Sequence, residues 1–193
     1  MKRVTVVLIS LVLCAFISSN AFAQSNLAFS GIGVKIGLVD PDDVDAALEF
    51  GIFTDLGRIT SSISLESYVN FWSKTEDITG GGEFYVRDFI IGAKSKYIFS
   101  TANPTIRPFA GAGLGFHILQ SGVDIPAIDL GGGMIIPAVS EDDTEIKIGL
   151  DIGGGILVDL NQSWAIQGET WYSIVSDISQ IAIQVGLLYK LGV

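Results

Sequence analysis

One segment of the chain, from Ile146 to Val158, alternates between apolar residues and polar or small ones at almost every step. Successive side chains of a β-strand point to opposite faces, so this period of two predicts a strand with one wholly apolar face. Gly154 is the single gap in the apolar series. The apolar members are Ile146, Ile148, Leu150, Ile152, Ile156 and Val158, and the opposite series is Lys147, Gly149, Asp151, Gly153 and Gly155. Such a strand must place its apolar face against a core or a lipid phase.

The same alternation recurs along the chain and predicts eight strands, with no comparable helical periodicity after Ala23. In several of them the alternation of apolar and polar residues holds for about ten residues, the length that a tilted strand needs to cross a bilayer. Strands of soluble proteins are shorter, at about five or six residues. The predicted strands are 28–39, 45–54, 58–72, 83–99, 105–117, 144–158, 163–173 and 179–191.

The beginning of the chain has the features of a secretory signal peptide. Lys2 and Arg3 form a positive start, the apolar run 4–16 follows, and small residues flank a cleavage site. An uncleaved membrane anchor is the alternative, and it is disfavoured because the apolar run is shorter than a spanning helix needs. We therefore expect export by the Sec pathway. The predicted boundaries are a signal peptide, 1–23, cut between Ala23 and Gln24, and one domain, 24–193.

The composition is acidic and yet apolar. The formal net charge is −10 and the mean hydropathy is +0.51. Excess negative charge argues against nucleic acid as a partner. After the signal segment no apolar run is long enough for a membrane-spanning helix, so the apolar surface is expected to be spread over strands. Cys14, the only cysteine, lies in the signal segment, and we expect no disulfide or thiol chemistry in the mature chain.

The predicted connections alternate in character. Three are short turns, at 55–57, 100–104 and 159–162. The others are more acidic and more varied, and they include 40–45, 73–82 and the long segment 118–143. Transmembrane barrels have short turns on the periplasmic side and longer loops outside the cell. The pattern therefore predicts that the long loop is extracellular.

Aromatic residues on the apolar faces lie toward the ends of the predicted strands. Phe89 and Tyr97 are separated by eight positions, and so are Trp164 and Tyr172. Eight residues at about 3.3 Å each, tilted by about 40°, span roughly 20 Å, close to the separation of two interfacial aromatic belts. The apolar faces are thus expected to face lipid. The predicted aromatic girdle is Phe89, Tyr97, Trp164, Tyr172 and Tyr189.

The polar faces are expected to line the barrel interior. Gly111, Gly113 and Gly115 share one such face with Arg107 and His117, and small residues make room for large ones where interior space is scarce. Buried charges are costly unless they are paired, so the inward charges are expected to form a structural salt-bridge network that includes Arg107. The predicted network is Lys35, Glu49, Glu66, Lys94, Lys96, Arg107, Lys147, Asp151 and Glu169.

Three segments carry a resemblance to a known family. They are Arg107-Pro108-Phe109-Ala110-Gly111-Ala112-Gly113-Leu114-Gly115-Phe116, Gly153-Gly154-Gly155-Ile156-Leu157-Val158-Asp159-Leu160 and Val185-Gly186-Leu187-Leu188-Tyr189-Lys190. With them the chain resembles the small eight-stranded outer-membrane barrels of the OmpA/OmpX type, in the outer membrane protein β-barrel domain family. The resemblance implies an all-β fold, an eight-stranded antiparallel up-and-down transmembrane β-barrel, in the outer membrane of a Gram-negative envelope.

The same resemblance implies a structural or surface-interaction role, with a filled or very narrow polar lumen, no enzymatic activity, no cofactor and no metal. The expected surroundings of the monomer are outer-membrane lipid and lipopolysaccharide, with the barrel-assembly machinery acting during biogenesis. Such proteins usually end in an aromatic residue. This sequence ends Leu191-Gly192-Val193, and Tyr189 is the nearest equivalent.

Three other functions stay open from the sequence. A soluble lipocalin-like carrier would reverse the two faces, a small-solute pore would leave the lumen open, and a lipid-modifying barrel enzyme would need a nucleophile. His117 is the only histidine, and Ser73 and Ser121 are candidate nucleophiles that no spacing selects. We expect His117 to be a structural or rim residue. The acidic segment 40–45 is expected to be a solvated loop rather than a cation site, because it lacks the pattern of an EF-hand loop.

Overall fold

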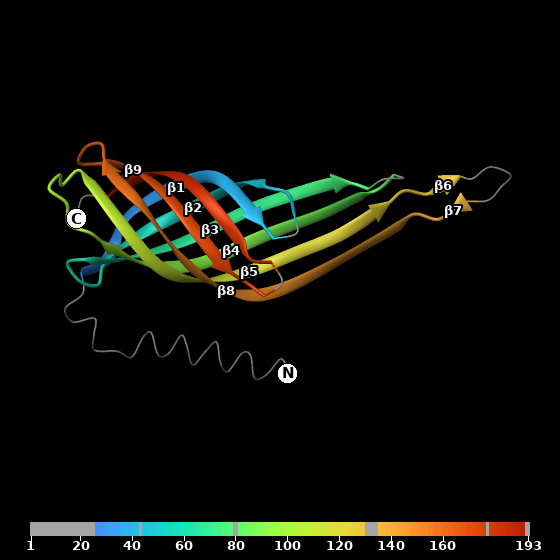
Figure 1. Cartoon of the computed structure of the whole chain (residues 1–193), viewed down its shortest axis with the longest axis horizontal. Helices are drawn as coiled ribbons and strands as arrows, with labels where there is room; N and C mark the ends of the chain where they lie inside the picture. The colour runs from blue at the N-terminus through green and yellow to red at the C-terminus, as the bar shows by residue number, and fades with distance from the viewer. Residues whose placement is uncertain (1–25, 43, 79–80, 130–134, 177, 192–193) are drawn as a thin grey trace, which may run out of the picture.

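The computed structural model describes residues 26–42, 44–78, 81–129, 135–176 and 178–191 (Figure 1). The predicted signal segment, with its cut between Ala23 and Gln24, lies outside the described residues, as do the glycines 131–133. Within the described part of the chain, no helix is long and apolar enough to cross a membrane.

Eight long strands close into one ring in the order β1-β10-β9-β8-β5-β4-β3-β2, and each is antiparallel to both of its neighbours. The predicted eight-stranded antiparallel up-and-down barrel is thereby confirmed. A separate two-stranded ladder of β6 (Ile128–Asp129) and β7 (Ile135–Ile136) lies between β5 and β8 along the chain. The barrel strands are β1 (Asn26–Pro41), β2 (Ala47–Arg58), β3 (Ile63–Asp77), β4 (Glu83–Ile98), β5 (Ile106–Ile125), β8 (Val139–Asp159), β9 (Trp164–Ile174) and β10 (Gln180–Lys190).

The apolar residues of the barrel face outward and the polar ones inward. Strand β10 shows this at every step between Gln180 and Tyr189: its even-numbered residues are buried, and its odd-numbered residues are exposed. The exposed series is Ile181, Ile183, Val185, Leu187 and Tyr189. A soluble lipocalin-like carrier has the opposite arrangement, with its apolar residues inside. That alternative is therefore incompatible with this barrel.

One predicted turn is wrong. Residues 55–57 lie within β2, and the chain turns instead at 59–62. The Asp55 carboxylate accepts a hydrogen bond from the Gly57 amide at 2.9 Å, and Gly57 has a φ of 83°. This local motif has the residues of a turn, but here it produces a β-bulge, since the register between β2 and β3 shifts between Asp55 and Arg58. Arg58, expected at the start of the third strand, is an exposed residue at the end of β2.

The predicted long loop 118–143 is also wrong in extent. Strands β5 and β8 stay paired without a break as far as Ile125 and Val139, so only 126–138 connect them, and β3 and β4 likewise extend to a turn at 78–82. Figure 1 shows β3, β4, β5 and β8 continuing past the other four barrel strands. We call this side of the barrel the extended end. The opposite side, with turns at 59–62, 99–105 and 160–163, is the short-turn end.

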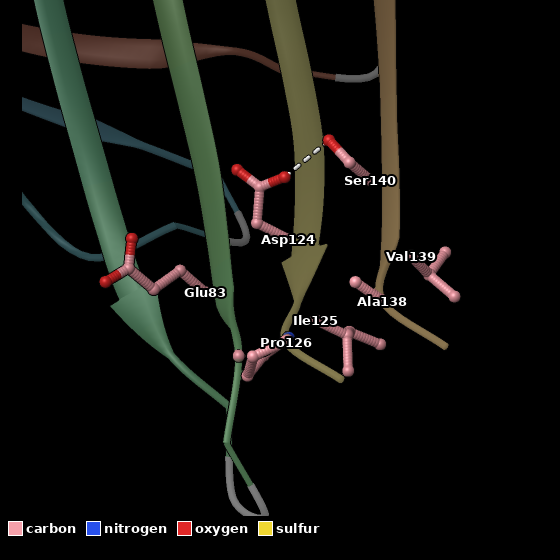
Figure 2. A pocket seen from close by; sticks show the side chains of 8 residues that line it. Glu83, Asp124, Ile125, Pro126, Ala138, Val139 and Ser140 are labelled. Carbon is pink, nitrogen blue, oxygen red and sulfur yellow. Dashed lines mark hydrogen bonds between the residues drawn. The ribbon is translucent and has the colours of Figure 1, made fainter. Parts of the chain in front are cut away.

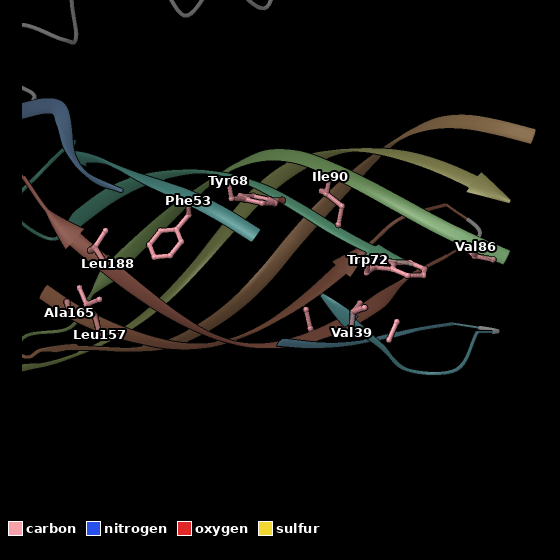
Figure 3. Packing of buried hydrophobic residues seen from close by; sticks show 11 residues of the cluster. Val39, Phe53, Tyr68, Trp72, Val86, Ile90, Leu157, Ala165 and Leu188 are labelled. Atoms are coloured by element: carbon pink, nitrogen blue, oxygen red, sulfur yellow. The ribbon is translucent and has the colours of Figure 1, made fainter. Parts of the chain in front are cut away.

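Large side chains fill the space inside the ring (Figure 3). Phe53 and Leu188 lie toward the short-turn end, Tyr68 lies in the middle, and Trp72 and Val86 lie toward the extended end. Glycines on neighbouring strands make this filling feasible. A Cβ atom at position 92 would lie 2.5 Å from Tyr68 Cζ, and one at position 115 would lie 2.8 Å from Tyr68 Oη. These two glycines therefore keep the space that the Tyr68 ring occupies.

Candidate functional site in the barrel interior

A cluster of charged side chains centres on Glu169 of β9. Its two carboxylate oxygens each lie 3.2 Å from an ammonium nitrogen, one from Lys35 of β1 and the other from Lys96 of β4. Gln167 donates a hydrogen bond to the same carboxylate at 2.7 Å, and Lys96 also donates to Glu66 of β3. All five side chains are buried. Charges from β1, β3, β4 and β9 are thus joined across the barrel, where burial demands that they be paired.

A second group surrounds Asp151 of β8. Tyr68 donates its hydroxyl to one carboxylate oxygen, and the Ser173 hydroxyl donates to the other at 2.6 Å. Lys94 lies beside this group, with its ammonium nitrogen 4.2 Å from the ring centroids of both Tyr68 and Trp171. Cation–π attraction from two rings stabilises an ammonium group that burial would otherwise disfavour.

A third layer lies nearer the extended end. The Glu49 carboxylate accepts a hydrogen bond from the Asn70 amide at 2.7 Å and another from the Gln184 amide. Trp72 donates its indole N–H to Gln180 at 3.1 Å. These contacts tie β2, β3 and β10 together, so the polar layers occupy successive heights of the interior.

His117 and Asp88 form a pair that is fully buried, with 2.7 Å between Nδ1 and Oδ2. The structure brings neither candidate serine to this pair. Ser73 is an exposed residue on the face of β3 opposite the buried Trp72, and Ser121 is four positions along β5 from His117, roughly 13 Å away at 3.3 Å per residue. The histidine thus lies inside the barrel, and neither candidate serine is beside it.

Two of the expected interior cations, Arg107 and Lys147, lie at the rims of the barrel. Arg107 pairs with Asp159 at 2.8 Å, and Lys190 reaches the same carboxylate oxygen at 3.2 Å, with all three side chains about a quarter exposed. Lys147 pairs with Glu145 at 2.8 Å near the extended end. The expectation that Arg107 belongs to the central network is therefore wrong. Arg107 is the second residue of β5, and the antiparallel pairing places it beside the end of β8. The sequence had assigned Asp159 to a turn, so this partner was missed.

The five residues of the predicted aromatic girdle all lie on the outer surface. Their exposed fractions run from 38% to 50%. Trp164 and Tyr189 are in contact at the short-turn end, with their ring centroids 4.9 Å apart, and Tyr97 contacts Phe99 at 5.1 Å. Aromatic rings collect where a lipid phase meets water.

Toward the extended end, the outer surface changes from apolar to polar between one row of outward-facing residues, taken across neighbouring strands, and the next row. The strand register places the residues of each row side by side. The last apolar row is Phe71, Phe89, Ile118 and Ile146, and the next outward row is Ser73, Arg87, Gln120 and Thr144. Such a change marks the upper limit of a lipid-facing belt.

Comparison with known families decides the assignment. A model of the outer membrane protein beta-barrel domain matches residues 9–190. The chain belongs to this family. As a member of it, the chain is an outer-membrane barrel, and its exposed apolar belt is the surface that contacts lipid. No curated protein sequence matches the chain.

Solved structures share the fold of this outer-membrane barrel. Neisserial surface protein A superposes with a TM-score of 0.63 at 15% identity, covering 86% of this chain and 99% of that one. Ail, the attachment invasion locus protein of Yersinia pestis, gives 0.57 at 13% identity, covering 84% and 97%. The N-terminal barrel domain of Pseudomonas aeruginosa OprF gives 0.54 at 12% identity, covering 84% and 98%. At these identities the likeness concerns the fold.

No group of three or more histidine, cysteine, aspartate or glutamate residues in the described part of the chain is arranged to hold a metal ion. In the acidic segment 40–45, Asp43 lies outside the described residues, and Asp45 is 3.6 Å from Lys74. The chemistry that the interior supports is the mutual neutralisation of buried charges.

Proposed function

We propose that this protein is a monomeric, non-conducting outer-membrane barrel whose role is carried by the extended end, facing outside the cell. The observation that carries the proposal is the filling of the interior by three polar layers and large rings. A cavity of only about 30 Å³ lies among Phe53, Glu66 and Lys96, which is room for about one water molecule. Because the lumen is filled in this way, the extended end is the surface available for function.

Planar-bilayer recording tests the closed lumen. The purified barrel should give no discrete current steps under conditions in which a general porin, added as a control, conducts. Steps whose frequency rises with the amount of protein would overturn the closed lumen and favour a small-solute pore.

The orientation follows from the rule that transmembrane barrels have short turns in the periplasm. We propose that the chain is exported by the Sec pathway after cleavage of residues 1–23. The start of β1 and the end of β10 would then lie on the periplasmic side, because Gly31 pairs with Lys190 on the short-turn side. Outer-membrane lipid and lipopolysaccharide would surround the belt, and the barrel-assembly machinery would insert it.

Cysteine labelling of intact cells tests this orientation. The only cysteine, Cys14, lies in the predicted signal segment, so a single introduced cysteine reports on its own position. Asp142→Cys at the extended end should react with a membrane-impermeant maleimide, whereas Gln162→Cys at the short-turn end should react only after the outer membrane is permeabilised. Both positions are exposed, which makes them a matched pair. The reverse pattern would contradict the proposed orientation.

A further inference from the structure

A small cavity lies inside the barrel near the short-turn end. Its volume is about 30 Å³, and its apolar wall includes Phe53, Leu157 and Leu188, which Figure 3 shows at that end of the interior. A space of this size holds one water molecule or one ion of similar size. The polar lining is Asp55, Ser64, Glu66, Lys96 and Gln167.

One carboxylate oxygen at this cavity has no partner. Only 5% of Glu66 is exposed, and its Oε2 accepts hydrogen bonds from Lys96 and, at 3.3 Å, from Gln167. Its Oε1 is buried and has no hydrogen-bond partner among the described residues. A buried charged oxygen is costly when it is left unpaired. A donor or a cation beside this atom would therefore stabilise the barrel.

A second carboxylate lies directly opposite Glu66. The register of β2 and β3 pairs Asp55 with Glu66, and both residues line the cavity. One oxygen of Asp55 accepts the Gly57 amide at 2.9 Å. Like charges directly opposite on neighbouring strands, about 5 Å apart, are destabilising. A cation between the two carboxylates would remove this repulsion, and the Ser64 hydroxyl in the same lining supplies a third oxygen.

Negative charge is in excess in the interior as a whole. His117 is buried beside Asp88, and even a protonated His117 would leave one buried carboxylate without a counter-charge. Burial makes an unbalanced charge expensive. Among the described residues, the buried lysines are Lys35, Lys94 and Lys96, and the buried carboxylates are Glu49, Glu66, Asp88, Asp151 and Glu169.

The charges around the cavity favour a monovalent cation. The two ammonium groups of the Glu169 cluster neutralise its two carboxylates, which leaves Asp55 without an ammonium partner in the described structure. One added unit of charge balances this group, whereas a divalent ion would exceed it and would lie beside the Lys96 ammonium group. Two carboxylates are also few for calcium, which takes six to eight oxygen ligands. The ion pairs at the nearby rim are about a quarter exposed, so water screens their charge.

A larger hollow at the extended end lacks these features. Its volume is about 420 Å³, and its lining includes Asp124, whose carboxylate accepts the Ser140 hydroxyl at 2.5 Å (Figure 2). Asp124 is exposed, so water already solvates its charge. Asp124 therefore offers a matched control for Asp55.

We propose that the cavity near the short-turn end binds one alkali cation of the size of potassium. The cation would lie between Glu66 Oε1 and the Asp55 carboxylate, with the Ser64 hydroxyl as a third ligand. Carboxylate and hydroxyl oxygens are suitable ligands for hard cations. The bound ion would join β2 to β3 beside the bulge that follows Asp55. The site lies at the end of the barrel opposite the extended end, so this inference is independent of the role proposed there.

The dependence of stability on salt tests the cation site. The barrel is unfolded by urea in zwitterionic lipid vesicles at constant ionic strength, while potassium chloride replaces tetramethylammonium chloride stepwise. Tetramethylammonium is too large for a cavity of about 30 Å³. Above the dissociation constant of the site, each tenfold rise in potassium should raise the folding equilibrium constant about tenfold, since the cation binds the folded barrel alone. A water molecule or a proton in the cavity would give equal stability in the two salts, and that result would overturn the proposal.

Two matched variants locate the site. Asp55→Asn removes one charge and keeps an oxygen that can accept the Gly57 amide, and Asp124→Asn makes the same change at the extended end. Potassium should stabilise Asp124→Asn as much as the unmodified barrel, but it should change the folding equilibrium of Asp55→Asn by less than about twofold per tenfold rise. In tetramethylammonium chloride alone, Asp55→Asn should be no less stable than the unmodified barrel, because it lacks the repulsion from Glu66. Loss of the potassium effect in Asp124→Asn, with the effect kept in Asp55→Asn, would overturn the proposed location.

The thallous ion gives a direct readout, because it substitutes for potassium and scatters X-rays anomalously. Crystals of the folded barrel soaked in thallous acetate should show an anomalous difference peak between the carboxylates of Asp55 and Glu66. Peaks confined to the acidic extended end would overturn the proposal, since they would show adventitious binding at exposed carboxylates alone.

Discussion

Replacing Glu169 with alanine should lower the free energy of unfolding by about 3–5 kcal/mol, because it leaves buried cations without their partner. Lys35 loses the only carboxylate with which it forms an ion pair in the described structure, and Lys96 keeps Glu66 alone. The measurement is reversible unfolding by urea in lipid vesicles, with heat-modifiable gel mobility as a check of the folded state.

Glu145→Gln is the matched control for this prediction. Glu145 also forms a lysine pair, with Lys147, but its side chain is 55% exposed. Exposed pairs of this kind contribute about 0–1 kcal/mol. Equal losses in the two variants would mean that the central network does not stabilise the barrel.

Replacing Lys35 by methionine together with Glu169 by leucine should recover much of the stability, since apolar groups of similar size can substitute for a buried ion pair.

Replacing Val185 with arginine should cost about 2–4 kcal/mol, although Val185 is 56% exposed in the isolated chain. Val185 is the middle member of the five outward residues of β10, so its side chain is expected near the centre of the bilayer. At a site exposed to water, such a change would alter stability by only about 0.5 kcal/mol. Folding into lipid vesicles at increasing urea concentrations measures the difference.

Gln120→Arg is the control for the lipid-facing belt. Gln120 is also exposed and outward, but it lies in the polar row beyond the belt. Its replacement should change stability by about 1 kcal/mol or less, as expected near a membrane interface. A penalty at Val185 no larger than that at Gln120 would contradict the placement of this face in lipid.

The barrel was predictable from the sequence because lipid imposes a two-residue period on the outer surface of every strand. The extended end was not predictable in the same way. Beyond Ile146 the outer residues face water and the period disappears, while backbone pairing between β5 and β8 continues to Val139. Strand length thus exceeds the length of the hydrophobic pattern. The bulge at Asp55 was missed for a related reason, since turn-forming residues can bend a strand without ending it.

The two-residue alternation along each strand was enough to predict which charged side chains point inward, but it did not predict which of them pair. Lys35 and Glu169 are 134 positions apart, and they meet only because the closed ring places β1 and β9 on either side of β10, so that both side chains enter one narrow interior. No local pattern encodes such a distance. Arg107 shows the same limit, because its partner depended on where β8 ends, a boundary that the sequence placed in a turn.

Closure of the ring has a consequence for the time course of assembly. Strand β1, the first to be synthesised, completes its pairing only with β10, the last, through contacts such as Gly31 with Lys190. Contacts between such distant positions form slowly because the entropy of closing a long loop must be overcome first. Until the final strand arrives, every partial intermediate retains two open edges. A nascent chain interrupted before β10 would therefore be a substrate for periplasmic chaperones and proteases rather than a smaller barrel.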